Sequence, residues 1–182
     1  MSHDGVALPD EIEEAVTFQE YAPAPRIDGV QLLALRKHRA DNGSFMEFVR
    51  VTDGRVEGLE PPFRLRQASV SEAAARRINA FHIHPLEPQN ELWCVTRGLL
   101  VVWLIDCRKG SPSLGVRRRV VLTGEEPALL RIPAGVAHGY RAGPSGATLL
   151  YLADQQFNPD RPNEGRLPWD YFGKDLWEED RG

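Results

Sequence analysis

The chain has 182 residues, of which 42% are hydrophobic and 26% are charged; these values are ordinary for one globular domain with a sizeable core. A formal net charge of -4 gives no electrostatic reason to expect nucleic acid or an anionic membrane as a partner. No apolar run reaches the roughly 18 residues that span a bilayer. The start lacks the basic and then apolar pattern of a signal peptide, so we expect a soluble, cytoplasmic protein.

The first part of the chain predicts one helix and two strands. Acidic residues favour a helix start at Asp10, with the helix running to about Gln19. The prolines of the YAPAP segment then favour an extended connector. Val30–Leu35 and Phe45–Val51 are apolar enough for strands, and the sequence DNG between them predicts a turn.

From Ile78 onward the sequence predicts a series of short strands separated by turns. The segments are INAFHIH, ELWCVTRG, LLVVWLID, VRRRVVL, ALLRIP, AHGYRA and ATLLYLA. Many short strands with Gly and Pro turns are typical of a sandwich or closed barrel. We therefore expect one all-β domain over residues 1–182, with an N-terminal arm at about 1–26 and a barrel at about 27–157. An irregular C-terminal tail at about 158–182 should include a short helix around 174–179.

Three of the five histidines fall in the strand-rich half. His82 and His84 are two residues apart, so on a strand both side chains point to the same face. A hairpin after them would bring Glu91 alongside, and His138 follows the turn IPAG. Three imidazoles and one carboxylate suit a divalent ion such as Zn, Fe, Mn, Ni or Co. The sequence thus predicts a metal site made of His82, His84, Glu91 and His138.

Several alternatives stay open for these residues. His138 after a Pro-Gly turn is also explained as a hydrogen-bonded turn residue, and Glu87 is a second candidate for the carboxylate ligand. Trp93 and Trp103 fit either an aromatic lining or the barrel core. The two cysteines, Cys94 and Cys107, lie in apolar segments, and we expect them to be reduced.

The same residues resemble the cupin superfamily. HIHPLEPQNELWCVTRG is similar to the first cupin motif, with a longer loop, and IPAGVAHGY is similar to the second. Within the cupins, the chain resembles the dTDP-4-dehydrorhamnose 3,5-epimerase family over most of its length. IDGVQLL, ADNGSFMEF and RGLLVVWLIDCRKGSPSLG are similar to that family's I-x-G-V, D-x-R-G-F-F-x-E and R-G-x-x-x-D-x-R-x-G-S-P-T-F-G segments. The resemblance implies a jelly-roll β-barrel.

The resemblance also implies roles for individual residues. Family members exchange protons beside a 4-keto group with a histidine base and a tyrosine acid, which fall on His82 and Tyr151. Substrate contacts are implied at Phe45, Glu47, Gln67, Asn79 and Trp93. The substrate would be a sugar nucleotide or a related carbonyl compound, and a homodimer is expected.

Three cations of the family pattern are missing from this sequence, and one of them is the arginine of the D-x-R-G segment, which is Asn42 here. The arginine before the base is Asn79 here, and the lysine that polarises the keto oxygen is Glu91. The residue two after the base is His84 where the family has glutamine. A divalent ion held by His84 and Glu91 would restore positive charge nearby. A His82 that binds the ion, however, would not be free to act as a base.

Three functions are therefore compatible with the sequence. The first is epimerisation of a keto-sugar nucleotide by proton abstraction. The second is a metal-dependent cupin of different chemistry, such as a dioxygenase, hydrolase or sugar isomerase. The third is a non-catalytic cupin that binds a sugar. Solvent deuterium exchange separates the first from the others, and metal content separates the second from the third.

Overall fold

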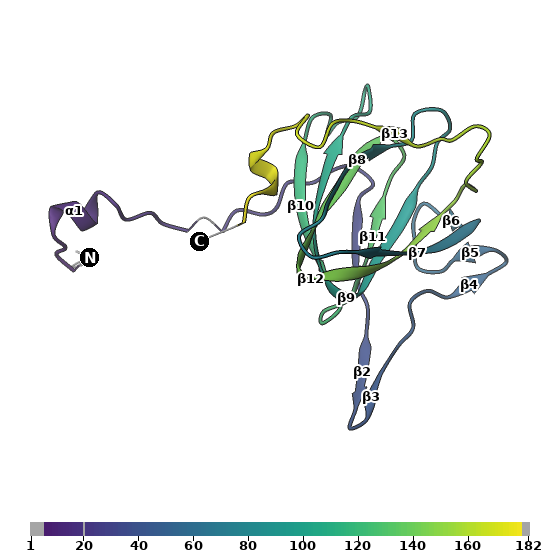
Figure 1. Ribbon diagram of the computed structural model, residues 1–182, viewed down its shortest axis with the longest axis horizontal. Helices are drawn as coiled ribbons and strands as arrows, with labels where there is room; N and C mark the ends of the chain where they lie inside the picture. The colour runs from purple at the N-terminus through teal and green to yellow at the C-terminus, as the bar shows by residue number, and fades with distance from the viewer. Residues whose placement is uncertain (1–5, 20, 180–182) are drawn as a thin grey trace.

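The computed structural model describes residues 6–19 and 21–179. The chain folds into a β-barrel from which an N-terminal arm and a two-stranded hairpin project (Figure 1). The arm carries the only α-helix of the described residues, α1 (Asp10–Glu13). The all-β barrel predicted from the sequence is confirmed.

An eight-stranded sheet forms the barrel, with strand order β1-β11-β9-β12-β8-β13; β10 also pairs with β9, and β7 pairs with β12. These strands are β1 (Gln31–Ala34), β7 (Gln67–Ala73), β8 (Ile78–Ile83), β9 (Glu91–Asp106), β10 (Arg117–Thr123), β11 (Ala128–Ile132), β12 (Val136–Ala153) and β13 (Gly165–Arg166). The projecting hairpin is β2 (Lys37–Ala40) with β3 (Gly43–Met46). A small sheet contains β4 (Val51–Thr52), β5 (Arg55–Val56) and β6 (Phe63–Arg64).

The two longest strands, β9 and β12, each join two segments that the sequence analysis separated at glycines. Gly98 and Gly146 have φ of +74° and +71°, and a Cβ on Gly98 would lie 2.0 Å from the carbonyl oxygen of Gly146. The β9–β12 register shifts between Ala142 and Ala147. These glycines therefore bend two continuous strands at one crossing instead of ending them.

Several local predictions were wrong. The helix ends at Glu13 instead of Gln19, and none of its residues is buried, so no packing supports a longer helix. The strand predicted from Phe45 to Val51 is divided between β3 and β4. The strands β2, β5, β6, β7 and β13 were not predicted. The C-terminal helix is a single 3-10 turn, η1 (Asp175–Trp177).

The C-terminal segment packs against the barrel. Phe81 on β8 is fully buried, and its ring lies 5.0 Å from that of Phe172 and 5.3 Å from that of Trp177. Trp103 donates its ring N–H to the carbonyl of Leu176. Trp103 therefore belongs to this packed cluster. The chain that leads to the cluster passes beside His82 and His84 at residues 163 and 164.

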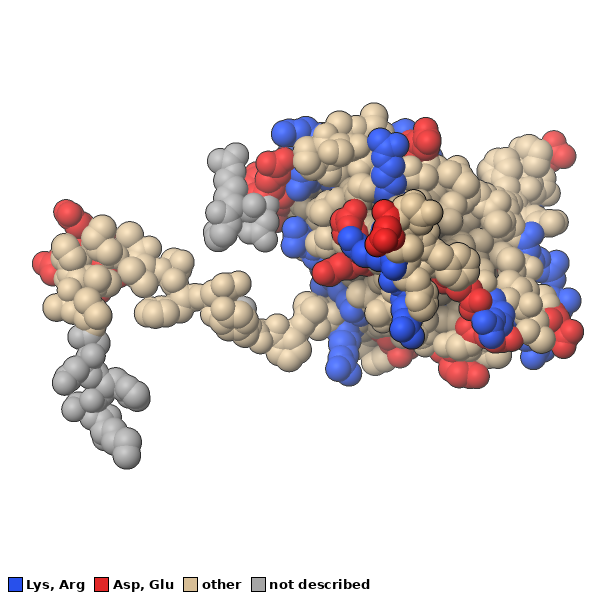
Figure 2. All heavy atoms as spheres, turned by 90° about the horizontal axis from the view of Figure 1, so that it is seen from below, with Lys and Arg blue, Asp and Glu red and all other residues tan. Residues whose placement is uncertain are grey.

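On the face shown in Figure 2, basic and acidic side chains are interspersed over the barrel. No helix within residues 6–19 and 21–179 is long and apolar enough to cross a membrane.

Candidate functional site

One cavity of about 820 Å³ collects most of the predicted site residues. Its lining combines side chains from β7, β8, β9 and β12 and from the segment before β13. The lining includes His82, His84, Glu91 and Tyr151, together with the predicted substrate contacts Gln67, Asn79 and Trp93. A cavity of this size with convergent polar groups is typical of a small-molecule site.

The predicted substrate contacts Phe45 and Glu47 do not line this cavity. Phe45 lies on β3 in the projecting hairpin and is 68% exposed. Glu47 follows the hairpin and forms an exposed ion pair with Arg50. Within this one chain, their role in binding substrate stays a prediction.

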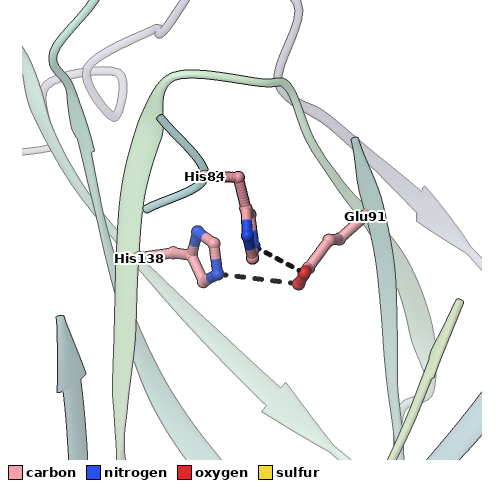
Figure 3. Close-up of side chains that lie close together, drawn as sticks. All are labelled: His84, Glu91 and His138. Carbon is pink, nitrogen blue, oxygen red and sulfur yellow. Dashed lines mark hydrogen bonds and ion pairs between the residues drawn. The ribbon is translucent and has the colours of Figure 1, made fainter. Parts of the chain in front are cut away.

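Three of the four predicted metal ligands come together. His84 directly follows β8, Glu91 begins β9 and His138 lies on β12, so three strands of one sheet bring them to one place (Figure 3). Their ligand atoms all lie within 4.8 Å of one another. Nε2 of His84 is 2.9 Å from Oε1 of Glu91, and Nε2 of His138 is 3.6 Å from Oε2.

The structure does not bring His82 into this group. Its Nε2 lies 3.1 Å from Oδ1 of Asn79, and its Nδ1 lies 3.7 Å from a carboxylate oxygen of Glu164. His82 pairs with His138 across β8 and β12, but its ring points to other partners. The structure thus groups three of the four predicted ligands, and metal binding by any of the four stays a prediction. The alternative carboxylate, Glu87, is exposed at the cavity rim.

Hydrogen bonds to backbone carbonyls fix the tautomers of the two histidines in the group. Nδ1 of His84 is 2.5 Å from the carbonyl oxygen of Asn163, and Nδ1 of His138 is 3.0 Å from that of Val136. Because a carbonyl oxygen only accepts, both Nδ1 atoms carry the hydrogen. In a neutral ring, Nε2 then has a lone pair that points at Glu91. The carboxylate oxygen also presents a lone pair, and two lone pairs that face each other require a cation between them. This donor set therefore fits either a shared proton or a metal ion.

Burial and charge shift the pKa values in opposite directions at this group. Burial alone would raise the pKa of Glu91, but the hydrogen bond from His84, the charges of both imidazoles and the Trp93 N–H lower it to about 2. Burial also opposes the positive charge on His84, yet its bond to Glu91 leaves its pKa raised overall. Burial lowers the pKa of His138. The centre thus holds a firmly anionic carboxylate that attracts a cation.

His82 has the electrostatics of a neutral base. Burial lowers its pKa to about 4, with further lowering from the charges of His138 and Arg166; Glu164 and Glu91 oppose this. At neutral pH its imidazole is therefore uncharged and carries one lone pair. Tyr151 lies on β12 and lines the same cavity.

Three residues around the histidines were missed by the sequence reasoning. Gln89 lies beside Glu91, and Asn163 and Glu164 contact His84 and His82 from the segment before β13. Gln89 lies in the loop between His84 and Glu91, which the sequence analysis interpreted only as a hairpin turn. No sequence signal links residues 163 and 164 to histidines about 80 positions earlier, because β13 has only two residues. Pairing of Gly165 with Ile83 and of Arg166 with His82 brings them there.

The amino-acid sequence is similar to a known protein family and to named proteins. A family model for dTDP-4-dehydrorhamnose 3,5-epimerase matches residues 24–171. The spore coat polysaccharide biosynthesis protein SpsL of Bacillus subtilis is 40% identical over 145 residues, which cover 79% of this chain and 91% of that protein.

The chain is also similar to a protein named as an epimerase and to a solved structure. A dTDP-4-dehydrorhamnose 3,5-epimerase of Methanothermobacter thermautotrophicus is 28% identical over 144 residues, covering 79% of this chain and 76% of the relative. The crystal structure of a dTDP sugar isomerase from Desulfovibrio desulfuricans G20 superimposes with a TM-score of 0.68 at 28% identity. That match covers 80% of this chain and 87% of the other.

Proposed function

Because the chain belongs to the dTDP-4-dehydrorhamnose 3,5-epimerase family, a family of epimerase enzymes, we propose that it exchanges protons beside the carbonyl of a 4-keto-6-deoxy sugar nucleotide. His82 is the base that removes a proton alpha to the carbonyl. Tyr151 is the acid that returns a proton from the other face. Both residues line the cavity of about 820 Å³, a volume in the range of small-molecule sites.

The observation that carries this proposal is the separation of His82 from the other three ligand candidates. A histidine bound to an ion lacks the lone pair that abstracts a proton. Among the described residues, the ring nitrogens of His82 contact Asn79 and Glu164 and none of the three ligand candidates, so the neutral imidazole keeps its lone pair. If His82 stays outside the ligand set, as we propose, the conflict between base and ligand that the sequence raised does not arise.

We further propose that His84, Glu91 and His138 bind a divalent ion, one of Zn, Fe, Mn, Ni or Co. The support is the donor set: two imidazoles with their Nδ1–H groups tied to carbonyls, and one carboxylate with a lowered pKa. A bound ion would supply a Lewis acid that polarises a carbonyl, at a position where the family pattern has a lysine. His84, Glu91 and His138 hold the ion, and Asn163 and Val136 orient the two rings.

Isotope exchange tests the reaction. The protein is incubated in deuterated water with a dTDP-4-keto-6-deoxyhexose, and deuterium at carbon 3 and carbon 5 is measured by mass spectrometry and NMR. We expect incorporation by the wild type and a loss of about 100- to 10,000-fold in His82→Asn, as for a general base. In Tyr151→Phe, deuterium should enter with retained configuration, because protonation then comes only from the side of the base.

The control for these variants is Tyr171→Phe, which removes the hydroxyl of an exposed tyrosine outside the cavity and should exchange like the wild type. Absence of solvent deuterium at both carbons would refute the epimerase proposal. Elemental analysis of protein purified without chelator tests the metal independently, with about one ion per chain expected. An ion without exchange would favour a metal-dependent cupin of other chemistry; neither result would favour a sugar-binding protein.

The resemblance also supports a homodimer, which light scattering after size exclusion measures directly. Both cysteines are free thiols in the described chain, which supports a reducing, cytoplasmic location. Fractionation of cells that express the natural gene tests the location.

A further inference from the structure

Gln89 places its amide against the proposed metal centre. Its Nε2 lies 2.9 Å from Oε1 of Glu91 and 3.3 Å from Nε2 of His84. The side chain is half-buried and lines the cavity. Gln89 stands in the loop of the stretch that resembles the first cupin motif, outside its two histidines and its glutamate. Its amide terminus thus touches two of the three ligand atoms at once.

These distances match the spacing of atoms that share one ion. Ligands about 2.0 to 2.1 Å from an ion lie about 3 Å apart in octahedral geometry and about 3.3 Å apart in tetrahedral geometry. The separation of 2.9 Å between His84 and Glu91 has the same size. The amide terminus of Gln89 therefore lies where a further ligand atom would lie.

The three-residue group is one donor short of the four protein ligands predicted from the sequence, because His82 points elsewhere. An amide nitrogen does not bind a divalent ion, but an amide oxygen does. Rotation of the Gln89 amide about its last side-chain bond exchanges the two atoms. We propose that Gln89 is the fourth protein ligand of the divalent ion, through Oε1. This inference rests on the metal binding proposed above for His84, Glu91 and His138.

The contact has a second reading in which Gln89 only donates a hydrogen bond to the Glu91 carboxylate. The two readings differ for a carboxylate at position 89. As a mere neighbour of Glu91, a second carboxylate would repel it whether or not metal is present. As a ligand, it would repel Glu91 in the metal-free protein and bind the ion more strongly in the loaded protein.

The test uses the full chain, cobalt(II) as the probe, and the variants Gln89→Leu and Gln89→Glu. Gln156→Leu is the matched control, because Gln156 lines the same cavity and, among the described residues, forms no hydrogen bond with the three ligands. Titration monitored by the visible absorption of cobalt(II) measures affinity and ligand field. Melting of metal-free and loaded protein measures the stabilisation by the ion.

We expect Gln89→Leu to bind cobalt(II) at least about 10-fold more weakly than the wild type and to show an altered absorption spectrum. Gln89→Glu should melt at a lower temperature than the wild type without metal, and should gain more on loading. Gln156→Leu should match the wild type. Unchanged affinity and spectrum in Gln89→Leu, with a normal wild type, would overturn the assignment while the three-residue site stands. A wild type that binds no cobalt(II) would overturn both.

Discussion

Asp106 offers a sharp test of how the barrel is held together near the end of β9. Its side chain is 1% exposed, and its carboxylate accepts hydrogen bonds from the backbone N, Nε and Nη2 of Arg108 and from the hydroxyls of Ser111 and Ser113. These five bonds span 2.6 to 3.0 Å. The perturbation is Asp106→Asn, which keeps the shape and removes the charge.

The expected loss of unfolding free energy follows from the hydrogen-bond acceptors that remain in the variant. An asparagine whose carbonyl takes the place of Oδ2 still accepts from Nη2 of Arg108 and from both serines. Its amide then faces the backbone N and Nε of Arg108, and both of these donors lose their acceptor. At about 1 to 3 kcal/mol for each buried donor left unsatisfied, we expect a loss of about 3 kcal/mol in unfolding free energy. For a chain of this length that corresponds to a fall of about 6 to 12 °C in melting temperature.

Urea unfolding followed by fluorescence at pH 7 measures the loss, with calorimetry as a second readout. Asp53→Asn is the control: this exposed turn residue should change stability by no more than about 0.5 kcal/mol. If the unfolding free energy of Asp106→Asn lies within about 1 kcal/mol of the wild-type value, the reasoning from three retained and two lost hydrogen bonds is refuted.

Further predictions concern pH, packing and the orientation of His84. Burial alone would raise the pKa of Asp106, but its hydrogen bonds hold the pKa well below the ordinary range; its contribution is therefore complete above the unfolded-state pKa of about 3.9 and is lost as pH falls toward the folded pKa. Urea melts at pH 7 and pH 3 should thus show a smaller difference between wild type and Asp106→Asn at the lower pH. Phe81→Ala should cost about 3 to 5 kcal/mol of unfolding free energy, because this fully buried ring packs on Phe172 and Trp177; a cost below 1 kcal/mol would contradict that packing. Asn163→Ala should weaken cobalt(II) binding by about 10- to 100-fold, since the Asn163 side chain holds its carbonyl near His84 through bonds to Leu86 and Glu87; equal affinity, with Asn158→Ala as control, would exclude this role.

The sequence predicted the barrel because strand periodicity and turn residues are local signals. His84, Glu91 and His138 were recognised for the same reason: alternation along a strand and a short hairpin fix which face they share. The boundaries of β9 and β12 were not predicted, because Gly98 and Gly146 are turn residues by composition. Only their close approach across two strands makes them bends.

The position of His82 depended on information that the local pattern does not contain. Alternation places it on the same face as His84, but Asn79 and Glu164 decide where its ring nitrogens point. Glu164 is 82 positions away, and the exact angle between two rings on one strand depends on such distant partners. Sequence spacing could therefore name the ligand candidates without separating His82 from the other three.

The pairing of β13 with β8 has a consequence for synthesis of the protein. The carbonyl of Asn163 and the carboxylate of Glu164 contact His84 and His82, and Gly165 and Arg166 hold them in place. A ribosome must therefore translate past residue 166 before either histidine acquires its full set of partners. Nascent chains that end earlier contain the imidazoles but not the groups that orient them, so the order of translation itself delays assembly of the site until the barrel strands have been made.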